Sequence, residues 1–411
     1  GSGEDGVLVG RARQRVHNVL KKTLILPVNL DPEDSVEDKR CFDILRNTTG
    51  RWTFGVTAYL EELQTLPNLS EKEAERFRDE IAEKTGLNKP YVQMCRDKAL
   101  QILKSYRRRN GNNGLPKMQQ KISVDVDQRC GRLVSDGDEA VLRLSTLRPR
   151  GVLEAPLIYH DFAKKVLADG WRAKSFKVVW KANRRLFEVH LAVEKDVEVE
   201  VWDCVGVDLG LQRPVVAYSL GEERVLVQLG RAALEPWLSR WLAVNNRYDK
   251  AQRLNITPLL KKLRRRRKNL TRALALHIAR QLAPIFRGRI VAIGLPKNIN
   301  QATRNKKTIH RWPYRLLAGT IAQKISEAGG VGLVMTEYWT TKTCSRCGAR
   351  LTKKDGNTVY IRDRFFRCRR CGLDMDRDAN AAKNIGYKAR DWLKSRIPAS
   401  GRPVGKPKAT Q

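Results

Sequence analysis

The sequence predicts a multidomain α/β protein with a small cysteine-rich module inserted near its end. The spacing of the apolar residues changes along the chain, from helical to alternating and then to a mixture of strands and helices. A chain of 411 residues, of which 41% are hydrophobic, can bury more than one core. Two cysteine pairs separated by twenty residues mark the inserted module.

The first half of the chain predicts a β module that is interrupted by a helical lobe. Residues 1–30 include the alternating segment KTLILPVNL, and residues 113–200 include four further segments with a period of two. Such short strands favour a small antiparallel barrel or sandwich. Residues 31–112 have helical spacing instead, with helices expected over 36–63 and 70–106. We expect residues 1–30 and 113–200 to form one N-terminal β-barrel that carries this lobe.

The second half predicts a mixed sheet covered by helices. Three apolar strands are followed by long helices, a fourth strand, a helix and a fifth strand. The five segments are VEVEVWDCVGVDLG, PVVAYSL, VLVQL, RIVAIGL and VGLVMTEYW. This order is the plan of an RNase H-like domain, in which carboxylates gather at one end of neighbouring strands. We assign residues 201–343 to its first part and 344–371 to an inserted ribbon. Residues 372–411 then form a final helix, expected over Asn380–Asp391, and a basic, partly disordered tail.

Positive charge dominates the composition. Lysine and arginine outnumber the acidic residues by 80 to 44, which gives a formal net charge of +36. Few partners other than a polyanion balance so much self-repulsion, so we expect nucleic acid. An anionic membrane surface is the weaker alternative, because the chain has no run of eighteen apolar residues. The N-terminus, GSGEDG, lacks the features of a secretion signal and begins like a cloning remnant.

Short basic runs are the candidates for nucleic-acid binding. KKLRRRRK carries seven positive charges in eight residues. Like charges four residues apart on a helix repel each other, so a merely solvated face is less favoured here than usual. On a helix beside a cleft, this run could line a channel for an RNA–DNA duplex. The candidate residues are Lys261, Lys262, Arg264, Arg265, Arg266, Arg267 and Lys268, together with Arg107, Arg108 and Arg109.

The cysteine pairs CSRC and CRRC have the ligand spacing of a zinc ribbon. Four thiolates leave no open coordination position for water, so we expect the zinc to be structural rather than catalytic. The predicted ligands are Cys344, Cys347, Cys368 and Cys371. The other cysteines are scattered singly, and we expect them to be small buried hydrophobes in a reduced protein. They are Cys41, Cys95, Cys130 and Cys204.

Two carboxylates occupy places where metal ligands of such a sheet converge. Asp208 ends its first strand, and Asp378 begins its last helix. Carboxylates that hold two hard cations roughly 4 Å apart can hydrolyse a phosphodiester. An aspartate at a strand end is also often only a turn or cap residue. Asp376 is the alternative to Asp378, although it can instead cap the helix or orient Arg377, and we expect Asn380 to support this turn.

At these positions the chain resembles the RuvC nuclease half of TnpB proteins, the transposon-encoded RNA-guided nucleases, and of their type V CRISPR and Fanzor relatives. GVDLG at 206–210, TTKTCSRCG at 340–348 and DRDANAAKNI at 376–385 look like three motifs of this family. The likeness covers residues 201–390 by motif and the N-terminal half by architecture. It implies a wedge barrel with a recognition lobe, a noncoding guide RNA and a double-stranded DNA target with a short flanking motif. It also implies two catalytic Mg²⁺ ions and a ribbon that contacts the target.

The chain departs from the family pattern at the fourth strand. Where the family has a glutamate just before a leucine, this sequence has Ile293 and Gly294, and residues 251–325 contain no acidic residue. Of the nearest acids, only Glu337 stands at the end of a strand, one strand away, which displaces its root by about 5 Å. Some TnpB and Fanzor proteins look as though they carry a glutamate relocated to this later position.

We therefore hypothesise that Asp208, Glu337 and Asp378 form a rearranged magnesium site in an RNA-guided DNA endonuclease. Two alternatives stay open. One is a nuclease-inactive, RNA-guided DNA-binding protein that serves as a repressor or targeting module, and the other is a zinc-dependent DNA-binding protein without a guide. A prokaryotic protein of this kind would act in the cytoplasm, at the nucleoid, and a eukaryotic one in the nucleus. The sequence leaves its oligomeric state open.

Overall fold

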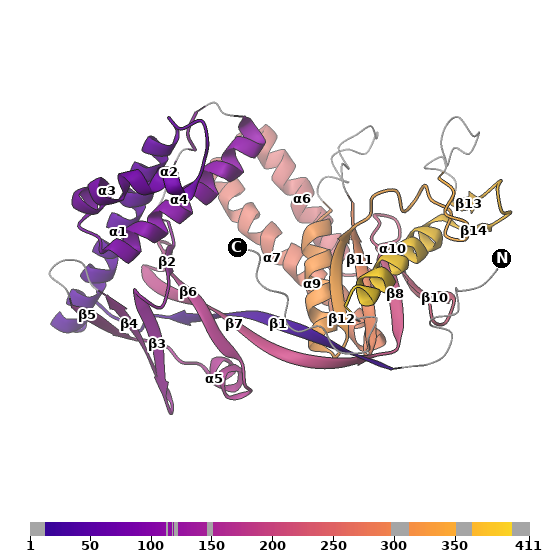
Figure 1. The fold of residues 1–411 in the computed structure, drawn as a ribbon, viewed down its shortest axis with the longest axis horizontal. Helices are drawn as coiled ribbons and strands as arrows, with labels where there is room; N and C mark the ends of the chain where they lie inside the picture. Colours follow the sequence, from indigo (N-terminus) through magenta and orange to yellow (C-terminus); the bar gives the residue numbers. More distant parts are fainter. Residues whose placement is uncertain are drawn as a thin grey trace. The chain divides into compact units, whose positions relative to one another are not determined.

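The chain divides into two compact units. The computed structural model describes residues 13–111, 114–116, 118, 122–145, 151–296, 312–350 and 364–396. The N-terminal unit is Lys21–Lys195, and the C-terminal unit consists of Gly1–Leu20 and Asp196–Gln411. The boundaries fall inside β1 (Gln14–Pro27) and β7 (Leu186–Val201), so both strands contribute residues to each unit (Figure 1). The six-part division expected from the sequence is finer than this and stays a prediction, and the expected basic tail from residue 397 lies outside the described residues.

Most helices of the N-terminal unit lie where helical spacing predicts them, but α5 (Asp161–Ala168) lies inside the stretch 113–200 that was expected to contain strands. The Ser35 side chain accepts a hydrogen bond from the Asp38 N–H and begins α1, which has an acidic first turn. The second helical stretch is interrupted at Gly86, which ends α3 with a φ of 66°, and Pro90 then lies in the first turn of α4. The helices are α1 (Val36–Leu63), α2 (Glu71–Ala74), η1 (Glu75–Phe77), α3 (Arg78–Thr85), α4 (Lys89–Asn110) and α5 (Asp161–Ala168).

The described strands of the N-terminal unit form two sheets. A four-stranded sheet has the order β1-β7-β6-β2, and a three-stranded sheet has the order β3-β4-β5. The additional strands are β2 (Val124–Val126), β3 (Gly131–Asp136), β4 (Glu139–Ser145), β5 (Val152–Pro156) and β6 (Arg172–Lys181). An isolated antiparallel bridge between Val28 and Leu157 links the chain after β1 to the chain after β5. The expected β module is therefore present as two linked sheets, and its closure into a barrel stays a prediction.

The C-terminal unit contains a mixed five-stranded sheet with the order β10-β9-β8-β11-β12. Its strands are β8 (Asp203–Asp208), β9 (Val215–Ser219), β10 (Arg224–Leu229), β11 (Arg289–Leu295) and β12 (Val331–Thr336). β11 runs parallel to both of its neighbours, β8 and β12, and β9 pairs antiparallel with β8 and β10. The fifth strand thus lies beside the fourth, as expected. One strand prediction was wrong, because the segment 197–210 is split at Trp202, whose N–H donates to the Gly288 carbonyl instead.

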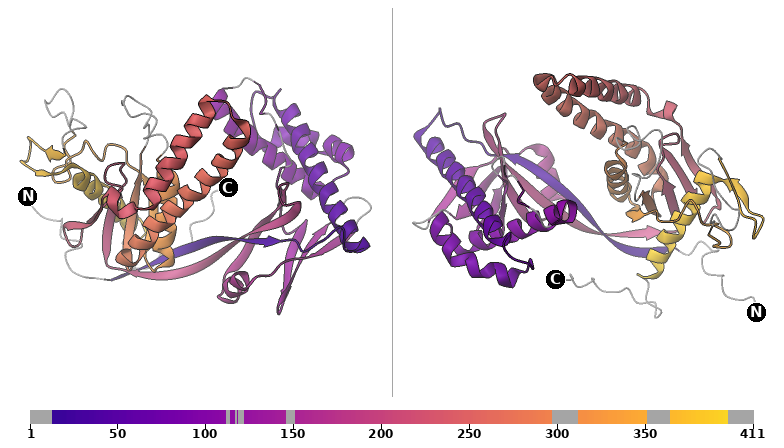
Figure 2. Two further views of the ribbon diagram at one scale, coloured as in Figure 1. Left: turned by 180° about the vertical axis from the view of Figure 1, so that it is seen from behind. Right: turned by 90° about the horizontal axis from the view of Figure 1, so that it is seen from above.

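Helices cover both faces of this sheet (Figures 1 and 2). One face packs against α6 (Trp237–Arg253), α7 (Thr257–Leu282) and α9 (Tyr314–Glu327). The opposite face packs against α10 (Arg377–Lys394), which begins three residues before the expected start at Asn380. Because side chains alternate along a strand, even-numbered residues of β8 and β11 face α10. Cys204, Ile290 and Ala292 belong to that set, and so does the end of β8 at Asp208.

Gly206 permits the close approach of α10 to β8. A Cβ atom on Gly206 would overlap the Ala382 carbonyl oxygen and the Gly386 nitrogen. Both are backbone atoms of α10, so the helix would have to move away to accept any side chain. Gly206 stands two residues before Asp208, and this packing therefore fixes the distance between the two elements that carry the aspartates.

We expect Gly206→Ala to lower the thermal unfolding midpoint of the protein, because the added methyl group separates α10 from the sheet. Overpacking of this kind costs about 1–3 kcal/mol. Gly319→Ala is the matched control, since a Cβ at Gly319 in α9 meets no described residue within 4 Å and alanine favours a helix. Differential scanning calorimetry that finds the two variants equally stable would contradict this packing.

Candidate functional site

Asp208 and Glu337 come together on the sheet face that α10 covers. Asp208 ends β8, and Glu337 directly follows β12, on the same side as Val331 and Leu333. Between these two strands lies β11, which has Gly294 at the corresponding position. A Cβ atom on Gly294 would lie only 2.7 Å from Glu337 Oε2 and 3.2 Å from Glu337 Cβ. The Glu337 side chain therefore occupies the space in which a side chain of residue 294 would begin.

The two carboxyl groups share a buried environment. Burial, followed by the nearby charge of Asp378, raises the pKa of Asp208 to about 7. Burial and then the charge of Asp208 raise the pKa of Glu337 to about 8, while Lys388 opposes the rise. A hydrogen bond links the pair, in which protonated Glu337 donates to ionised Asp208. Without a cation, the pair therefore retains a proton at neutral pH.

The chemistry of this pair fits a divalent cation. Glu337 Oε2 is buried and has no hydrogen-bond partner among the residues that the structure describes. A buried carboxylate oxygen without a partner is unfavourable, and oxygen ligands of this kind suit Mg²⁺. A cation at this place would satisfy the oxygen and replace the shared proton. Asp208 and Glu337 are the residues that would hold it.

Asp378 lies at the same end of the sheet but has other partners. It is in the first turn of α10, and its charge acts on Asp208. Its carboxylate is 3.6 Å from Arg213 Nη1, 3.8 Å from Arg364 Nη1 and 3.5 Å from Arg377 Nη2. In the described part of the chain, the only group of three or more histidine, cysteine, aspartate or glutamate side chains placed to hold a metal ion is formed by cysteines. The structure thus joins two of the three predicted acids directly and places the third nearby.

Asp376 caps α10 rather than facing the Asp208 pair. Its Oδ1 accepts hydrogen bonds from the N–H groups of Asp378 and Ala379, at 2.9 and 3.1 Å. Its Oδ2 accepts a hydrogen bond of 2.6 Å from Arg213. Although burial acts in the opposite direction, these hydrogen bonds hold the pKa of Asp376 below its usual value. Capping was one of the two roles expected for Asp376. Asp378, in the first turn of the helix, is therefore the candidate metal ligand of the two.

Two further side chains belong to this site and were missed by sequence reasoning. Arg213 contacts both Asp376 and Asp378 from the turn after β8. Tyr314 begins α9, and burial, followed by the charges of Glu337 and Asp208, raises its pKa to about 12. Each is a single residue in a loop or at a helix end, so no spacing pattern in the sequence indicates its role.

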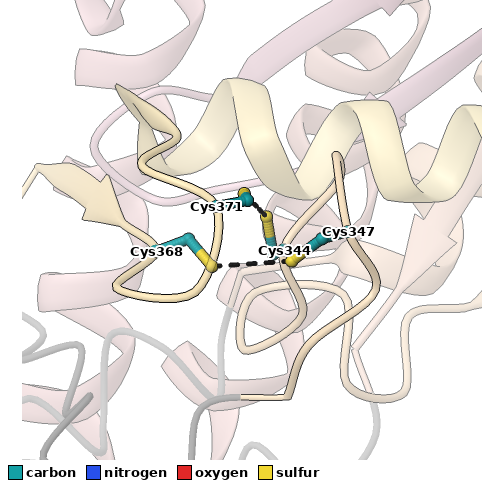
Figure 3. A group of neighbouring side chains, drawn as sticks. All are labelled: Cys344, Cys347, Cys368 and Cys371. Atoms are coloured by element: carbon teal, nitrogen blue, oxygen red, sulfur yellow. Dashed lines mark hydrogen bonds between the residues drawn. The ribbon is translucent and has the colours of Figure 1, made fainter.

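The four predicted zinc ligands form one cluster (Figure 3). Cys344 Sγ lies 3.5 Å from Cys371 Sγ, and Cys347 Sγ lies 3.6 Å from Cys368 Sγ. All four sulfur atoms lie within 4.8 Å of one another, which suits a tetrahedral ion bound by four thiolates. The predicted set of ligands is thus brought together completely.

Two similar turns build this cysteine cluster. In the first, the Cys344 N–H donates to the Ala349 carbonyl and the Gly348 N–H donates to the Cys344 carbonyl. Cys368, Leu373 and Gly372 repeat the pattern, and both glycines have a φ of 70°. β13 (Phe365–Arg367) pairs antiparallel with β14 (Asp374–Asp376) beside the second turn.

Thiolate formation is favoured at one ligand and opposed at another. Despite its burial, Cys368 accepts hydrogen bonds from the N–H groups of Cys371 and Arg370, which lower its pKa to about 7. Burial raises the pKa of Cys344 to about 12. Bound zinc would stabilise all four thiolates. The single cysteines outside this cluster, Cys41, Cys95, Cys130 and Cys204, are all buried, as expected.

The basic runs lie on helices in both units. In α7, Lys261, Lys262, Arg264, Arg265, Arg266 and Lys268 are exposed, while Arg267 lies over the Tyr248 ring at 4.3 Å. The α4 arginines differ from one another. Arg107 Nη2 donates to the carbonyls of Gln64 and Leu66 at 3.3 and 3.2 Å, just beyond α1, whereas Arg108 is exposed. Arg109 bonds to Ser105 within its own helix. Among the described residues, no helix is long and apolar enough to span a bilayer.

Comparison with known proteins matches one part of the site region, without Asp208, to a family model. The model described as Cas12f1-like, TNB domain matches residues 314–385. This range starts at α9 and ends within α10, so it includes Glu337, the four cysteines and Asp378.

Two curated relatives match this chain, each over only part of its own length. The TnpB-like protein ORF457 of Acidianus two-tailed virus is 34% identical over 131 residues, which are 32% of this chain and 27% of that protein. The CRISPR-associated endodeoxyribonuclease Cas12f1 of Sulfoacidibacillus thermotolerans is 35% identical over 77 residues, which are 19% of this chain and 17% of that protein. The chain thus spans about a quarter or less of the length of these relatives.

One solved structure is similar over most of this chain. The cryo-EM structure of a Cas12f1–sgRNA–target DNA complex aligns with a TM-score of 0.54 over 90% of this chain and 99% of that chain. The sequence identity is 15%, so this likeness concerns the mixed α/β fold.

The burial of Asp208 and Glu337 predicts that the stability of the cation-free protein depends on pH. Their pKa values rise from 3.8 and 4.5 to about 7 and about 8 on folding. The folded state therefore binds more protons than the unfolded state within this window, and its stability falls as the pH rises through it. We expect Asp208→Asn to raise the thermal unfolding midpoint more at pH 8 than at pH 5, by about 2–4 °C for each kcal/mol of relieved repulsion.

Asp391→Asn is the matched control for this measurement, because Asp391 is exposed on α10. Calorimetry without added divalent cations distinguishes the outcomes. Equal shifts for Asp208→Asn at both pH values would contradict the shared buried charge.

Removing one thiolate should release the zinc. We expect purified Cys371→Ser to contain much less zinc than the wild type, which should hold about one equivalent, because three thiolates bind it more weakly. Limited proteolysis should then cut between residues 344 and 371. Elemental analysis checks the metal, and Cys41→Ser, in the other unit, should keep it. Full zinc content in Cys371→Ser would contradict the four-cysteine site.

Proposed function

On the premise that the chain is a TnpB-family protein, which the family model, the relatives and the fold support together, we propose that it is an RNA-guided DNA endonuclease. Cleavage would proceed by two-metal-ion hydrolysis of a phosphodiester in an RNase H-like, RuvC-type site. The observation that carries this proposal is the position of Glu337. Its carboxylate lies beside Asp208, in the space above Gly294 where the family pattern has its own glutamate.

The proposed roles of the acids follow from their surroundings. Asp208, Glu337 and Asp378 would hold two Mg²⁺ ions, which supply an activated water and stabilise the leaving oxygen. Asp208 and Glu337 would have to release their shared proton to hold such ions, so binding would strengthen as the pH rises. Arg213 and Arg364 neutralise Asp378 in the cation-free protein. Cation binding therefore requires these arginines to give up part of that contact.

Nucleic-acid contacts would come from both units. The exposed basic residues of α7 suit the phosphates of a guide RNA paired with a DNA strand, because they recognise charge and duplex geometry rather than sequence. The helical lobe and the β module would read a short DNA motif beside the target. A structural zinc ion would stabilise the ribbon near the cut strand. The protein would work at the nucleoid in a prokaryote or in the nucleus of a eukaryote.

Guided binding without cleavage is the second candidate function. The ion pairs of Asp378 with Arg213, Arg364 and Arg377 favour it, because they occupy the third acid. In that case the protein would act as a repressor or targeting module. The two functions differ in a single measurable property, which is whether bound DNA is cut.

Substitution of Glu337 separates these functions. With the co-purified guide RNA, Mg²⁺ and a matching plasmid, we expect Glu337→Ala to lose cleavage by at least about a hundredfold, because one metal ligand is removed. Binding to the same DNA should remain, as a filter-binding assay would show. Cleavage by Glu337→Ala at the wild-type rate would eliminate the relocated site. A wild-type protein that binds guided DNA but never cuts it would favour the second function.

Restoring the usual position provides the sharper control. In Glu337→Ala, the carboxylate leaves the space beside Gly294. Two close neighbours of a new Cβ then remain, the flexible end of Ile385 at 2.7 Å and the Cβ of residue 337 at 3.2 Å, and each would have to shift slightly. The double variant Gly294→Glu with Glu337→Ala should therefore recover part of the activity. Gly294→Glu with Glu337 retained should instead be less active than the wild type, because both glutamate side chains then compete for one space.

A further inference from the structure

Three side chains of helix α10, spaced four residues apart, form hydrogen bonds with the segment that contains Glu337. Asn380, Asn384 and Lys388 lie on one side of the helix, and each bonds to the backbone of residues 336–345. We call these three residues the α10 ladder. The bonded segment begins one residue before Glu337 and ends one residue after Cys344.

Asn380 holds the end of this segment that enters the zinc cluster. Its Oδ1 accepts a hydrogen bond of 3.0 Å from the Ser345 N–H, and its Nδ2 donates to the Thr343 carbonyl at 2.9 Å. Both Asn380 and Ser345 are buried. Cys344, the first predicted zinc ligand, lies between the two bonded residues. A buried amide that uses both ends in this way fixes the position of the first cysteine turn against α10.

Asn384 holds the middle of the segment and is connected to Glu337 through Thr340. Its Nδ2 donates to the carbonyls of Thr340 and Thr343, at 2.8 and 2.7 Å. Thr340 is itself buried, and its N–H and hydroxyl both donate to the Glu337 carbonyl, at 3.3 and 3.0 Å. The backbone of Glu337 is thus connected to α10 by a short series of hydrogen bonds.

Lys388 holds the start of the segment. Its Nζ donates to the Thr336 carbonyl, the last residue of β12. Glu337 follows directly, and its N–H makes a 3.3 Å bond to Leu295 at the end of β11. Beyond this point the segment leaves the sheet, and Trp339 adopts a φ of 64°, a conformation that few non-glycine residues take. The turn is therefore held by the ladder and by its own threonines rather than by strand pairing.

We propose that Asn384 is a positioning residue for Glu337, and that the α10 ladder couples the zinc cluster to the acidic site by fixing both to one helix. This inference rests on the proposed function and deepens it. The helix that carries Asp378 in its first turn also sets where Glu337 stands. The ladder is the device that lets an acid after β12 serve a site centred on β8.

Cation binding without any DNA tests this role. Mn²⁺ replaces Mg²⁺ at oxygen sites, and its binding to the zinc-loaded full chain can be followed by electron paramagnetic resonance. We expect Asn384→Ala to weaken Mn²⁺ binding by about tenfold or more, as is usual when a residue that orients a metal ligand is lost. Zinc content should stay the same, because the four thiolates are untouched. Lys394→Ala, at an exposed position of the same helix, should bind Mn²⁺ like the wild type.

Asn384→Asp supplies a second variant of nearly the same size. An ionised carboxylate cannot donate to the Thr340 and Thr343 carbonyls, so this variant should also lose Mn²⁺ affinity while its core packing is kept. Hydrogen exchange should show faster exchange of the Thr340 amide in both variants. Unchanged Mn²⁺ affinity in Asn384→Asp would overturn the positioning role, as would an equal loss in Lys394→Ala.

Failure of the inference can be told apart from failure of the proposed function. If Asp208→Asn and Asn384→Ala both weaken Mn²⁺ binding but the wild type cuts no guided DNA, the positioning role stands and the nuclease function falls. If the wild type cuts DNA and Asn384→Ala binds Mn²⁺ normally, only the positioning role falls. A wild type that binds no Mn²⁺ at the Asp208 pair would overturn both.

Discussion

The candidate acidic site depends on one contact, in which the Glu337 carboxylate packs against the backbone of Gly294. A carboxylate after β12 can reach the end of β8 only if nothing projects from β11 between them. Glycine at position 294 leaves this space open, and Glu337 Oε2 enters it to within 2.7 Å of where a Cβ would stand. Glycine in place of an acid at the end of β11 and glutamate after β12 are thus parts of the same packing arrangement.

Helix α10 turns this local contact into a site. Gly206 allows the helix to lie directly on β8, so Asp378 in its first turn is held near Asp208. Along the same helix, Asn380 and Asn384 hold the turn between Glu337 and the cysteine cluster. Side chains of α10 and the end of β8 therefore meet at one end of the sheet. The cost of this arrangement is a pair of buried carboxyl groups with raised pKa values, which a divalent cation would stabilise.

Much of this arrangement was predictable from the sequence, for identifiable reasons. The cysteine spacing predicted the metal cluster, because ligand geometry constrains cysteines that are only three positions apart. The inner strands of the C-terminal sheet, β9, β8 and β11, are buried apolar runs, and the order of the five strands along the chain placed Glu337 beside β11. Arg213 and the α10 ladder were not predicted as contacts, since their partners lie about 40 to 160 residues away and depend on how α10 packs. β3 was missed because its exposed, polar residues lack a clear alternation.

The most direct test of the central claim is anomalous diffraction from crystals of the protein soaked in Mn²⁺. The account predicts a Mn²⁺ peak about 2.1–2.2 Å from carboxylate oxygens of both Asp208 and Glu337, close to the Gly294 backbone. A Mn²⁺ ion bound to Asp208 while Glu337 turns away from it, or no peak at this end of the sheet, would contradict the claim that the glutamate after β12 replaces the one absent from β11.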